Sequence, residues 1–367
     1  MNGEKTKLGV LGLFLLGFLA MGMVQATNIH NCTVLTGNGV TWNLTSDIVN
    51  STNATCMIFN GNNSVLNCNG YTIDGVGTGG SKGIATYANS SNDTINGCGV
   101  SSDWATGVSI ISNNNHIADS LISGEDCLVT TAVTNLTIDD TELTGCTGTG
   151  FIMIGLAGTN AFTNLEIDAR TPAAIACVTG NACSFNMVDG TVYGTIAYAA
   201  VTTGTANLQD SYYNKSRVTN GNVVSGAVIN YKWTTDIKVV DGKSGNAISG
   251  ANVTYYTAAD SFYGLTNAAG YVASHVVTAQ KLVNSTKTYD YMPATLTASK
   301  TGTNYVAYSG THTFDGSATD TISLYYPSTS TYFDVFIDNL FGILFGLLVL
   351  AVIIIFVAMY IKEMKQL

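Results

Sequence analysis

The stretch Asn135–Leu143, which reads NLTIDDTEL, decides the fold because its pattern returns along the chain. Apolar Ile138 is followed five positions later by apolar Leu143. Two residues five apart on one straight strand point to opposite faces, because side chains alternate with period two. A bend must therefore lie between them if both are buried. The same spacing relates Ile95 and Val100, Ile117 and Ile122, Phe162 and Ile167, Cys183 and Val188, and Leu208 and Tyr213.

The bend is expected two positions after the first apolar residue of each pair. That position mostly holds residue types that accept left-handed backbone geometry, namely Gly97, Asp119, Asp140, Asn164 and Asp210. Phe185 is the exception. The first members of successive pairs are 22, 21, 24, 21 and 25 residues apart, and a looser unit with Leu66 and Ile73 precedes them. Units of this length must stack to bury their apolar sides, so we expect about seven coils of a solenoid from Ser64 to Val228.

The repeat resembles the right-handed parallel β-helix repeat family, the pectate-lyase-like superfamily. The matching runs are NDTIN at Asn92–Asn96, NHIADSLI at Asn115–Ile122 and NLTIDDTEL. The opening stretch Cys32–Gly75 is similar to archaeal surface-protein members of that family. The resemblance covers about half of the chain and implies an architecture better than an activity.

The two ends are predicted to be a signal peptide and a membrane anchor. Lys5 and Lys7 precede an uncharged run that ends in a small residue, so residues 1–26 fit a signal peptide, with an uncleaved anchor as the alternative. Residues 340–361 are uncharged and long enough to cross a bilayer as a helix. Lys362 and Lys365 then place the tail, residues 362–367, in the cytoplasm. We therefore expect a single-pass cell-membrane protein whose remaining residues are extracellular.

The exported part is strongly acidic. Of 14 Lys and Arg in the whole chain, four lie in the two ends, and of 24 Asp and Glu, two lie there. Residues 27–338 thus carry 10 basic and 22 acidic side chains, a formal charge of −12. Such a surface does not favour nucleic acid as a partner.

All the cysteines lie in the expected β-helix, residues 27–229, and they are even in number, which indicates disulfides in an oxidising compartment. Cys68 and Cys98 follow the first apolar residues of consecutive coils, so they are placed to bridge two layers. Sequential pairing predicts the bonds Cys32–Cys56, Cys68–Cys98, Cys127–Cys146 and Cys177–Cys183. Zinc binding is disfavoured, because the four histidines, His30, His116, His275 and His312, are scattered.

The chain also carries many N-glycosylation sequons, which favour a glycosylated surface. Together with the two ends and the opening motif, they suggest an archaeal cell-surface glycoprotein, with a bacterial or viral source left open. The sequons start at Asn31, Asn43, Asn50, Asn53, Asn62, Asn89, Asn92, Asn135, Asn214, Asn252 and Asn284.

A second extracellular domain is expected at residues 230–326. Short alternating segments separated by Gly, Asn and Asp turns indicate a small β-sandwich. The order of TDIKVV at Thr235–Val240, AISGANVTYY at Ala247–Tyr256 and GLTNAAGYV at Gly264–Val272 resembles carboxypeptidase-regulatory-like and Ig-like modules, which implies a spacer. Residues 327–339 would link it to the membrane helix. We expect this domain to cover one end of the β-helix and Asn31 to Asn60 to cover the other, although the stretch before Ser64 could also be a full coil.

No catalytic residue is predicted, but one acidic patch is a candidate for binding a glycan or calcium. Glu142 and Glu166 precede the second apolar residue of consecutive coils and should stack on the outer surface. Asp168 and Asp189 are each six after their coil's first apolar residue, with Arg170 two positions further on. Stacked carboxylates attract a divalent cation. The alternative is a solvated face with one salt bridge.

Two other residue sets have simpler interpretations. The bend residues are explained by backbone geometry alone. Exposed aromatic side chains could form platforms for sugars, but they can equally be core or ordinary surface residues. The aromatic residues concerned are Trp42, Trp104, Tyr193, Tyr198, Tyr212 and Tyr213.

These observations favour a structural or adhesive, glycan-binding surface protein without a cofactor, unless calcium serves as one. A membrane-tethered polysaccharide lyase or glycoside hydrolase is the alternative from another class. Its basic residues would have to come from Lys82, Arg170, Lys215 or Arg217, and the Gly-His-Gly and Arg-Ile-Lys signatures of such hydrolases are absent. A third possibility is a cell-envelope lattice or accessory subunit, in which self-association is the function.

Overall fold

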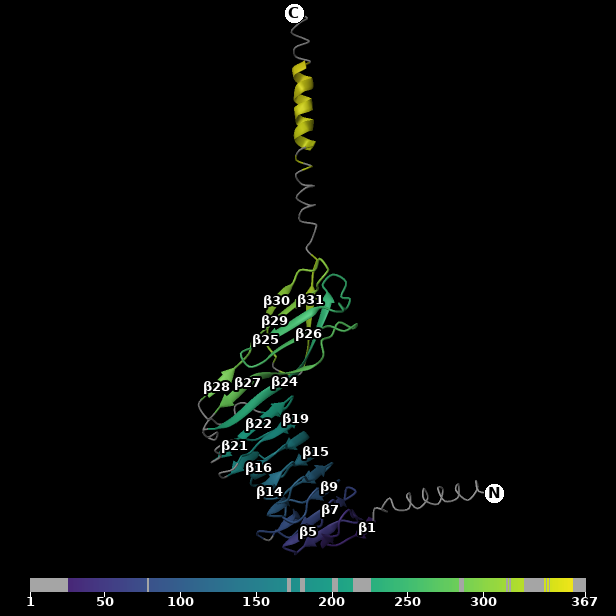
Figure 1. Cartoon of the computed structure of the whole chain (residues 1–367), viewed down its shortest axis with the longest axis vertical. Helices are drawn as coiled ribbons and strands as arrows, with labels where there is room; N and C mark the ends of the chain where they lie inside the picture. The colour runs from purple at the N-terminus through teal and green to yellow at the C-terminus, as the bar shows by residue number, and fades with distance from the viewer. Residues whose placement is uncertain are drawn as a thin grey trace, which may run out of the picture.

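The computed structural model describes residues 26–77, 79–169, 173–178, 182–199, 204–213, 226–283, 287–314, 316, 318–326, 340, 342 and 344–358, without the side chains of 197–199, 213, 287 and 318. These residues form a stack of coils, a second β-rich module and a helical segment along one long axis (Figure 1). The predicted signal peptide, linker and cytoplasmic tail lie essentially outside the described residues.

One wall of the coils is an eight-stranded sheet whose neighbouring strands are all parallel. Each strand belongs to a successive coil, so pairing joins segments that are far apart in sequence. Its strands are β2 (Thr33–Thr36), β5 (Thr55–Asn60), β8 (Lys82–Thr86), β11 (Thr106–Ile110), β14 (Asp126–Thr134), β16 (Phe151–Ala157), β18 (Ile175–Val178) and β21 (Ile196–Ala199).

The rest of each coil consists of a strand that bends, or two short strands on either side of a bend. Equivalent residues stack: Ile117 pairs with Ile95 on one side and with Ile138 on the other. The predicted parallel β-helix is thereby confirmed. The strands are β1 (Ala26–Ile29), β3 (Thr41–Leu44), β4 (Ile48–Ser51), β6 (Val65–Asn67), β7 (Thr72–Gly75), β9 (Thr94–Asn96), β10 (Gly99–Val100), β12 (His116–Ala118), β13 (Leu121–Ile122), β15 (Thr137–Leu143), β17 (Ala161–Ile167), β19 (Phe185–Val188), β20 (Thr191–Val192), β22 (Gly204–Gln209) and β23 (Tyr212–Tyr213).

The predicted bends have the expected left-handed backbone. Asp119, Asp140 and Asn164 have φ angles of 50°, 46° and 49°. In the looser unit, Asn69 and Gly70 are both left-handed, with φ angles of 53° and 83°, which accommodates its extra residues. A short polar side chain or glycine is required because other side chains pay a steric penalty in this conformation.

One predicted pair is wrong. Phe162 pairs with Met187 and Ile167 pairs with Val192, so the apolar pair of that coil is Met187 and Val192 rather than Cys183 and Val188. The bend residue is then Asp189, whose φ is 54°. Phe185, which broke the expected pattern, is a buried strand residue whose ring stacks on Phe162 at 5.3 Å between centroids.

The N-terminal stretch is not a cap in the expected sense, because it continues the coils. Trp42 stacks on Leu66, and Ile48 stacks on Ile73, in the same parallel register as later coils. Strands β1 and β2 in turn pair with β3 and β5. Of the two possibilities left open by the sequence, the structure therefore has a full coil, formed by β2, β3 and β4, before Ser64.

The interior of the β-helix is an apolar column that contains the stacked pairs. All four disulfides predicted from sequential pairing are present. Cys68–Cys98 joins consecutive layers, whereas Cys177–Cys183 closes a short local loop.

The second module begins within strand β24 (Ala227–Asp241), which crosses the predicted domain boundary. Its first part pairs with β22 of the last coil, and its last part pairs with β31. A separate four-stranded antiparallel sheet has the order β26-β25-β29-β30. The module's other strands are β25 (Asn252–Tyr256), β26 (Ser261–Leu265), β27 (His275–Val283), β28 (Lys287–Asp290), β29 (Ala294–Ser299), β30 (Tyr308–His312) and β31 (Ala318–Leu324).

A second apolar cluster lies between these two groups of strands. It includes Ile237 and Val239 of β24 on one side, and Val253, Tyr255 and Leu296 of the four-stranded sheet on the other. An independent core agrees with a separate unit, while its relationship to Ig-like modules stays a prediction.

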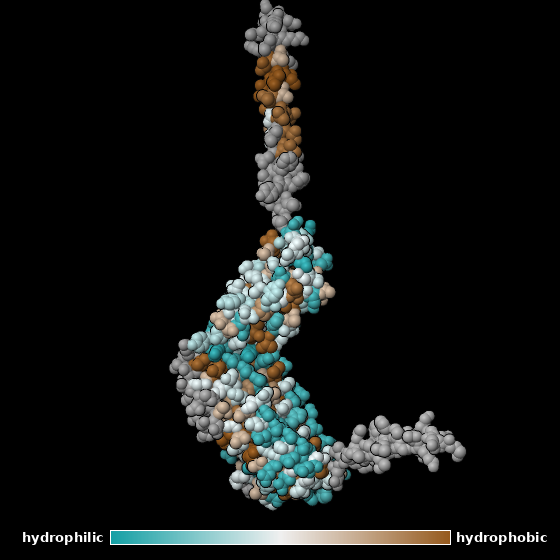
Figure 2. Space-filling model, viewed as in Figure 1, coloured by the Kyte–Doolittle hydropathy of each residue, from teal (hydrophilic) through white to brown (hydrophobic). Residues whose placement is uncertain are grey.

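Helical residues 340, 342 and 344–358 follow the second module (Figure 1). Figure 2 shows this segment as mostly hydrophobic. Within the part of the chain that the structure describes, no helix meets the length and hydrophobicity needed to span a bilayer.

Candidate functional site

An open groove of about 510 Å³ lies over the bends of three consecutive coils. Two outward columns form it. One column contains Leu121, Glu142 and Glu166, which are stacked in register on β13, β15 and β17. The predicted stacking of the two glutamates is therefore observed. The groove is lined by Asp119, Ser120, Leu121, Asp140, Thr141, Glu142, Asn164 and Glu166.

The second column is the bend column, which the sequence had explained by geometry alone. Asp119, Asp140 and Asn164 have the left-handed backbone that geometry requires, and they also line the groove. Asn164 donates a hydrogen bond through Nδ2 to Asp140 Oδ1 at 2.7 Å. The signal for this site was present in the sequence, since a bend residue stands two positions before each glutamate in Asp140–Glu142 and Asn164–Glu166.

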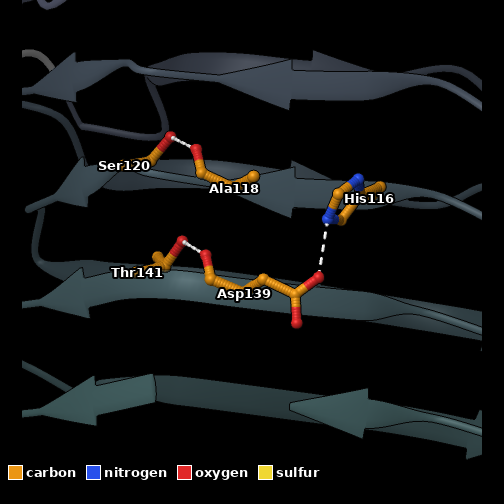
Figure 3. A network of polar contacts seen from close by, with 5 residues as sticks. All are labelled: His116, Ala118, Ser120, Asp139 and Thr141. Atoms are coloured by element: carbon orange, nitrogen blue, oxygen red, sulfur yellow. Dashed lines mark hydrogen bonds and ion pairs between the residues drawn. The ribbon is translucent and has the colours of Figure 1, made fainter. Parts of the chain in front are cut away.

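The hydroxyls between the two columns are held by the chain itself. Ser120 Oγ donates to the carbonyl oxygen of Ala118 at 2.7 Å, and Thr141 Oγ1 donates to that of Asp139 at 2.9 Å (Figure 3). Both side chains are buried, so these bonds satisfy hydroxyls that would otherwise be costly to bury. They fix the bend and thereby the directions of the neighbouring carboxylates.

A histidine–carboxylate pair lies on the strand side of the bend. His116 Nε2 and Asp139 Oδ2 are 2.9 Å apart on adjacent strands β12 and β15 (Figure 3). Neither residue lines the groove. The pair links two coils at the groove's margin, and about two fifths of each side chain is exposed.

The remaining members of the predicted patch are not part of the groove. Asp189 is a bend residue, so it is not in register with Asp168. Asp168 follows Ile167, which pairs with Val192, and therefore lies level with Tyr193. The error follows directly from the misassigned pair in that coil. Arg170 lies outside the described residues.

One exposed aromatic side chain, Tyr212, continues the glutamate column, and a second, Tyr193, lies beside it. Thr191 pairs with Glu166 and then with Tyr212, so the tyrosine stands two strands beyond the glutamate. The rings of Tyr212 and Tyr193 are 6.1 Å apart. Among the other aromatic candidates, Trp104 is buried, Trp42 is half-buried, and the side chains of Tyr198 and Tyr213 lie outside the described part.

The chemistry of the groove is that of carboxylates, hydroxyls and one amide. Its lining, among described residues, includes no lysine, arginine or histidine that could remove a proton from a substrate. Within the same described part, no three His, Cys, Asp or Glu side chains are grouped as a metal site. The arrangement offers many hydrogen-bond acceptors to a ligand rich in hydroxyl or ammonium groups.

The sequon asparagines differ in exposure. Asn43, Asn62 and Asn252 are half-buried, and Asn214 and Asn284 lie outside the described residues. The amide of Asn135 donates to Asn114 Oδ1 at 2.9 Å, so this sequon is engaged in a ladder between coils. The exposed members are Asn31, Asn50, Asn53, Asn89, Asn92 and Asn135.

Comparison with known proteins gives little additional information. No family model and no curated protein matches the chain. Among solved structures, the Dettilon tailspike protein (gp208) aligns with 11% sequence identity over 74% of this chain and 70% of its own, at a TM-score of 0.31. A likeness this low carries no argument about function.

Proposed function

We propose that the protein is a surface glycan-binding protein, tethered to a membrane at its C-terminus, whose β-helix binds a sugar chain in the groove. The observation that carries this proposal is the column Leu121, Glu142, Glu166, Thr191 and Tyr212, which combines apolar, acidic, hydroxyl and aromatic side chains along one line. Sugar rings present apolar faces to aromatic residues and hydroxyls to carboxylates.

The tether and the surface location rest on the two chain ends. The uncharged run at residues 340–361 and the acidic exported part support an anchored ectodomain, with the second module as an Ig-like spacer. The exposed sequons at Asn31, Asn50, Asn53 and Asn89 support a glycosylated surface near the first coils. An archaeal envelope is the setting that the opening motif favours.

The charge of the groove restricts its ligand. Asp119, Asp140, Glu142 and Glu166 repel uronates and sulfated sugars, whereas they accept hydrogen bonds from neutral or amino sugars. An anionic glycan would need a bridging cation such as calcium. We therefore propose a neutral or amino-sugar glycan that binds without calcium.

Polysaccharide cleavage is the second candidate, and one observation favours it. Glu142 and Glu166 are paired on adjacent strands, as two carboxyls that act as acid and base or nucleophile must be close. A lyase is less well supported, because the lining of the groove, among the residues that the structure describes, contains no basic side chain.

A glycan array probed with the full chain in detergent, with and without calcium, tests the proposal. Glu142→Gln and Glu166→Gln should each weaken binding about three- to tenfold by removing one charged acceptor. Glu125→Gln, at an exposed glutamate outside the groove, is the matched control. Release of reducing ends from any bound glycan, abolished by either groove substitution, would instead establish a hydrolase. Binding that is unaffected by both substitutions would remove the groove as the site.

A further inference from the structure

The outer face of the four-stranded sheet in the second module has the composition of a binding surface. Along β25, Val253 and Tyr255 are buried, whereas Thr254 and Tyr256 are exposed. Strand β29 alternates between buried and more exposed residues, and the edge strand β26 alternates between half-buried and exposed ones. One side of the sheet therefore contributes to the module's core, and the other side faces solvent.

The exposed side is organised in rows across the strands. Tyr263 pairs with Thr254, which pairs with Thr297, which pairs with Ser309. The next row contains Tyr256, Thr295 and Thr311. Each row thus contains one tyrosine, followed on the neighbouring strands by side chains with hydroxyl groups. Neighbouring strands are about 4.8 Å apart.

The two tyrosines are unusually open for large side chains in a folded module. Tyr256 is 61% exposed and Tyr263 is 64% exposed. The phenol of Tyr263 donates to Asn252 Oδ1 at 2.7 Å, which holds its ring against the sheet. Leu265, further along β26, extends the same apolar edge. Exposed apolar groups gathered on one face mark an interaction site more often than scattered ones do.

The outward strand positions of this face carry no charged side chain, whereas the groove on the β-helix is acidic. Every outward position that the structure describes on β25, β26, β29 and β30 is Ser, Thr, Asn, Tyr or Leu. An anionic lipid surface would be expected to meet basic side chains at such a face. An uncharged ligand with hydroxyl groups is the better match to these side chains.

We propose that this face is a second, independent glycan site, and that it binds an uncharged, extended β-linked polysaccharide by stacking sugar rings on Tyr256 and Tyr263. The threonine and serine hydroxyls then bond to the sugar hydroxyls. The face of an open sheet suits an extended, ribbon-like chain. The two sites differ in charge, so their ligands and their mutational sensitivities differ.

Co-sedimentation of the full chain in detergent with particulate cellulose and with chitin tests this proposal. Tyr256→Ala with Tyr263→Ala should weaken binding to at least one of them by about tenfold or more, because two stacked rings are lost. Tyr87→Ala, at an exposed tyrosine of the β-helix, and Glu142→Gln, in the groove, should leave it unchanged. Loss of binding in the groove variant alone would assign this ligand to the β-helix.

Four other results would overturn the proposal. The first is that the wild-type chain binds neither particle, and the second is that the double tyrosine variant binds as tightly as wild type. The third is a dimer, detected by light scattering, that the double variant abolishes, because a second copy of the chain would then cover the face. The fourth is a glycan on Asn252, detected by mass spectrometry, because this residue lies in the sheet beside Tyr263 and its glycan would obstruct the surface.

Discussion

The β-helix and the second module stabilise sheets by different means. In the β-helix, parallel strands stack equivalent residues, so one residue type forms a column through several coils; Asn230, Asn207 and Asn186 are joined in this way by side-chain hydrogen bonds of 2.9 and 2.7 Å. In the module's four-stranded sheet, antiparallel strands pair residues across a sheet with distinct inner and outer faces. The column is therefore the unit of structure and function in the β-helix, whereas the sheet face is the unit in the second module.

Removal of a disulfide between layers should give the largest difference in stability between the β-helix and the second module, because it destabilises only the β-helix. All eight cysteines lie in the β-helix, and Cys68–Cys98 closes a loop across consecutive coils with a sequence separation of 30. Its replacement by Cys68→Ala with Cys98→Ala should lower the unfolding free energy of the coils by about 3–4 kcal/mol. Hydrogen exchange, followed by mass spectrometry of the full chain, should show faster exchange in β6 to β12 and unchanged exchange in β25 and β29.

The pair Cys177→Ala with Cys183→Ala is the control for loop length, because that bond closes a loop with a separation of six. Its loss should cost about 1 kcal/mol less than the loss of Cys68–Cys98. Equal exchange changes in the module and in the coils would contradict the independence of the two cores.

Acidification should also change the unfolding free energies of the two regions in opposite directions. Burial raises the pKa of Asp93, inside the β-helix, to about 6, although the backbone N–H of Ser64 opposes the shift. The other oxygen of this buried carboxylate has no hydrogen-bond partner among the described residues. Since the folded state keeps a proton that the unfolded state releases, the unfolding free energy of the coils should fall as pH rises from about 4 to 6 and then level off.

The pKa of Asp241, in the second module, is shifted in the opposite direction to that of Asp93. Hydrogen bonds from the Ser244 backbone N–H and the Tyr305 hydroxyl lower its pKa to about 2. Its contribution is present above about pH 4 and is lost as pH falls towards 2. Urea unfolding at several pH values measures these free energies, and hydrogen exchange assigns each transition to the β-helix or to the module.

Asp93→Asn is the variant that sharpens this test. In the next coil, Asn115 occupies the same position, and its amide donates to the Ser112 carbonyl at 2.8 Å. The substitution should stabilise the coils by on the order of 2 kcal/mol at pH 8, and by progressively less towards pH 4. A constant difference at all pH values would show that Asp93 does not titrate in this range.

The repeat could be predicted from sequence because each coil repeats the same physical requirement. Two buried residues five apart need a left-handed bend, and Asp140 or Gly97 meets that need. The disulfides Cys68–Cys98 and Cys127–Cys146 followed from the same register, whereas the other two were predicted as closures of short local loops. The groove was half predicted: Glu142 and Glu166 were placed correctly, but Asp119 and Asp140 were assigned to geometry only, since no single coil shows that two columns converge.

The remaining errors came from places where the repeat changes length. Additional residues between Cys177 and Phe185 shift the register of the next coil, and Cys183 imitates its first apolar residue. Asp189 was therefore placed on the open face instead of at a bend. In the second module, the uncharged face could not be identified, because it becomes a surface only when four strands are aligned in their order β26-β25-β29-β30.

Substitution at Asp189 distinguishes the two registers by a small but direct effect. The structure gives Asp189 a φ of 54°, so Asp189→Val should lower the unfolding free energy by about 1–2 kcal/mol through steric conflict. Asp189→Gly should be neutral or slightly stabilising, because glycine adopts this conformation freely. Thr191→Val, on β20 of the same coil, is the control and should change stability by less than about 0.5 kcal/mol. If Asp189→Val proves no more harmful than Thr191→Val in urea unfolding, then Asp189 is an ordinary strand residue, and the pairing of Met187 with Phe162 must be abandoned together with the separation of Asp189 from Asp168.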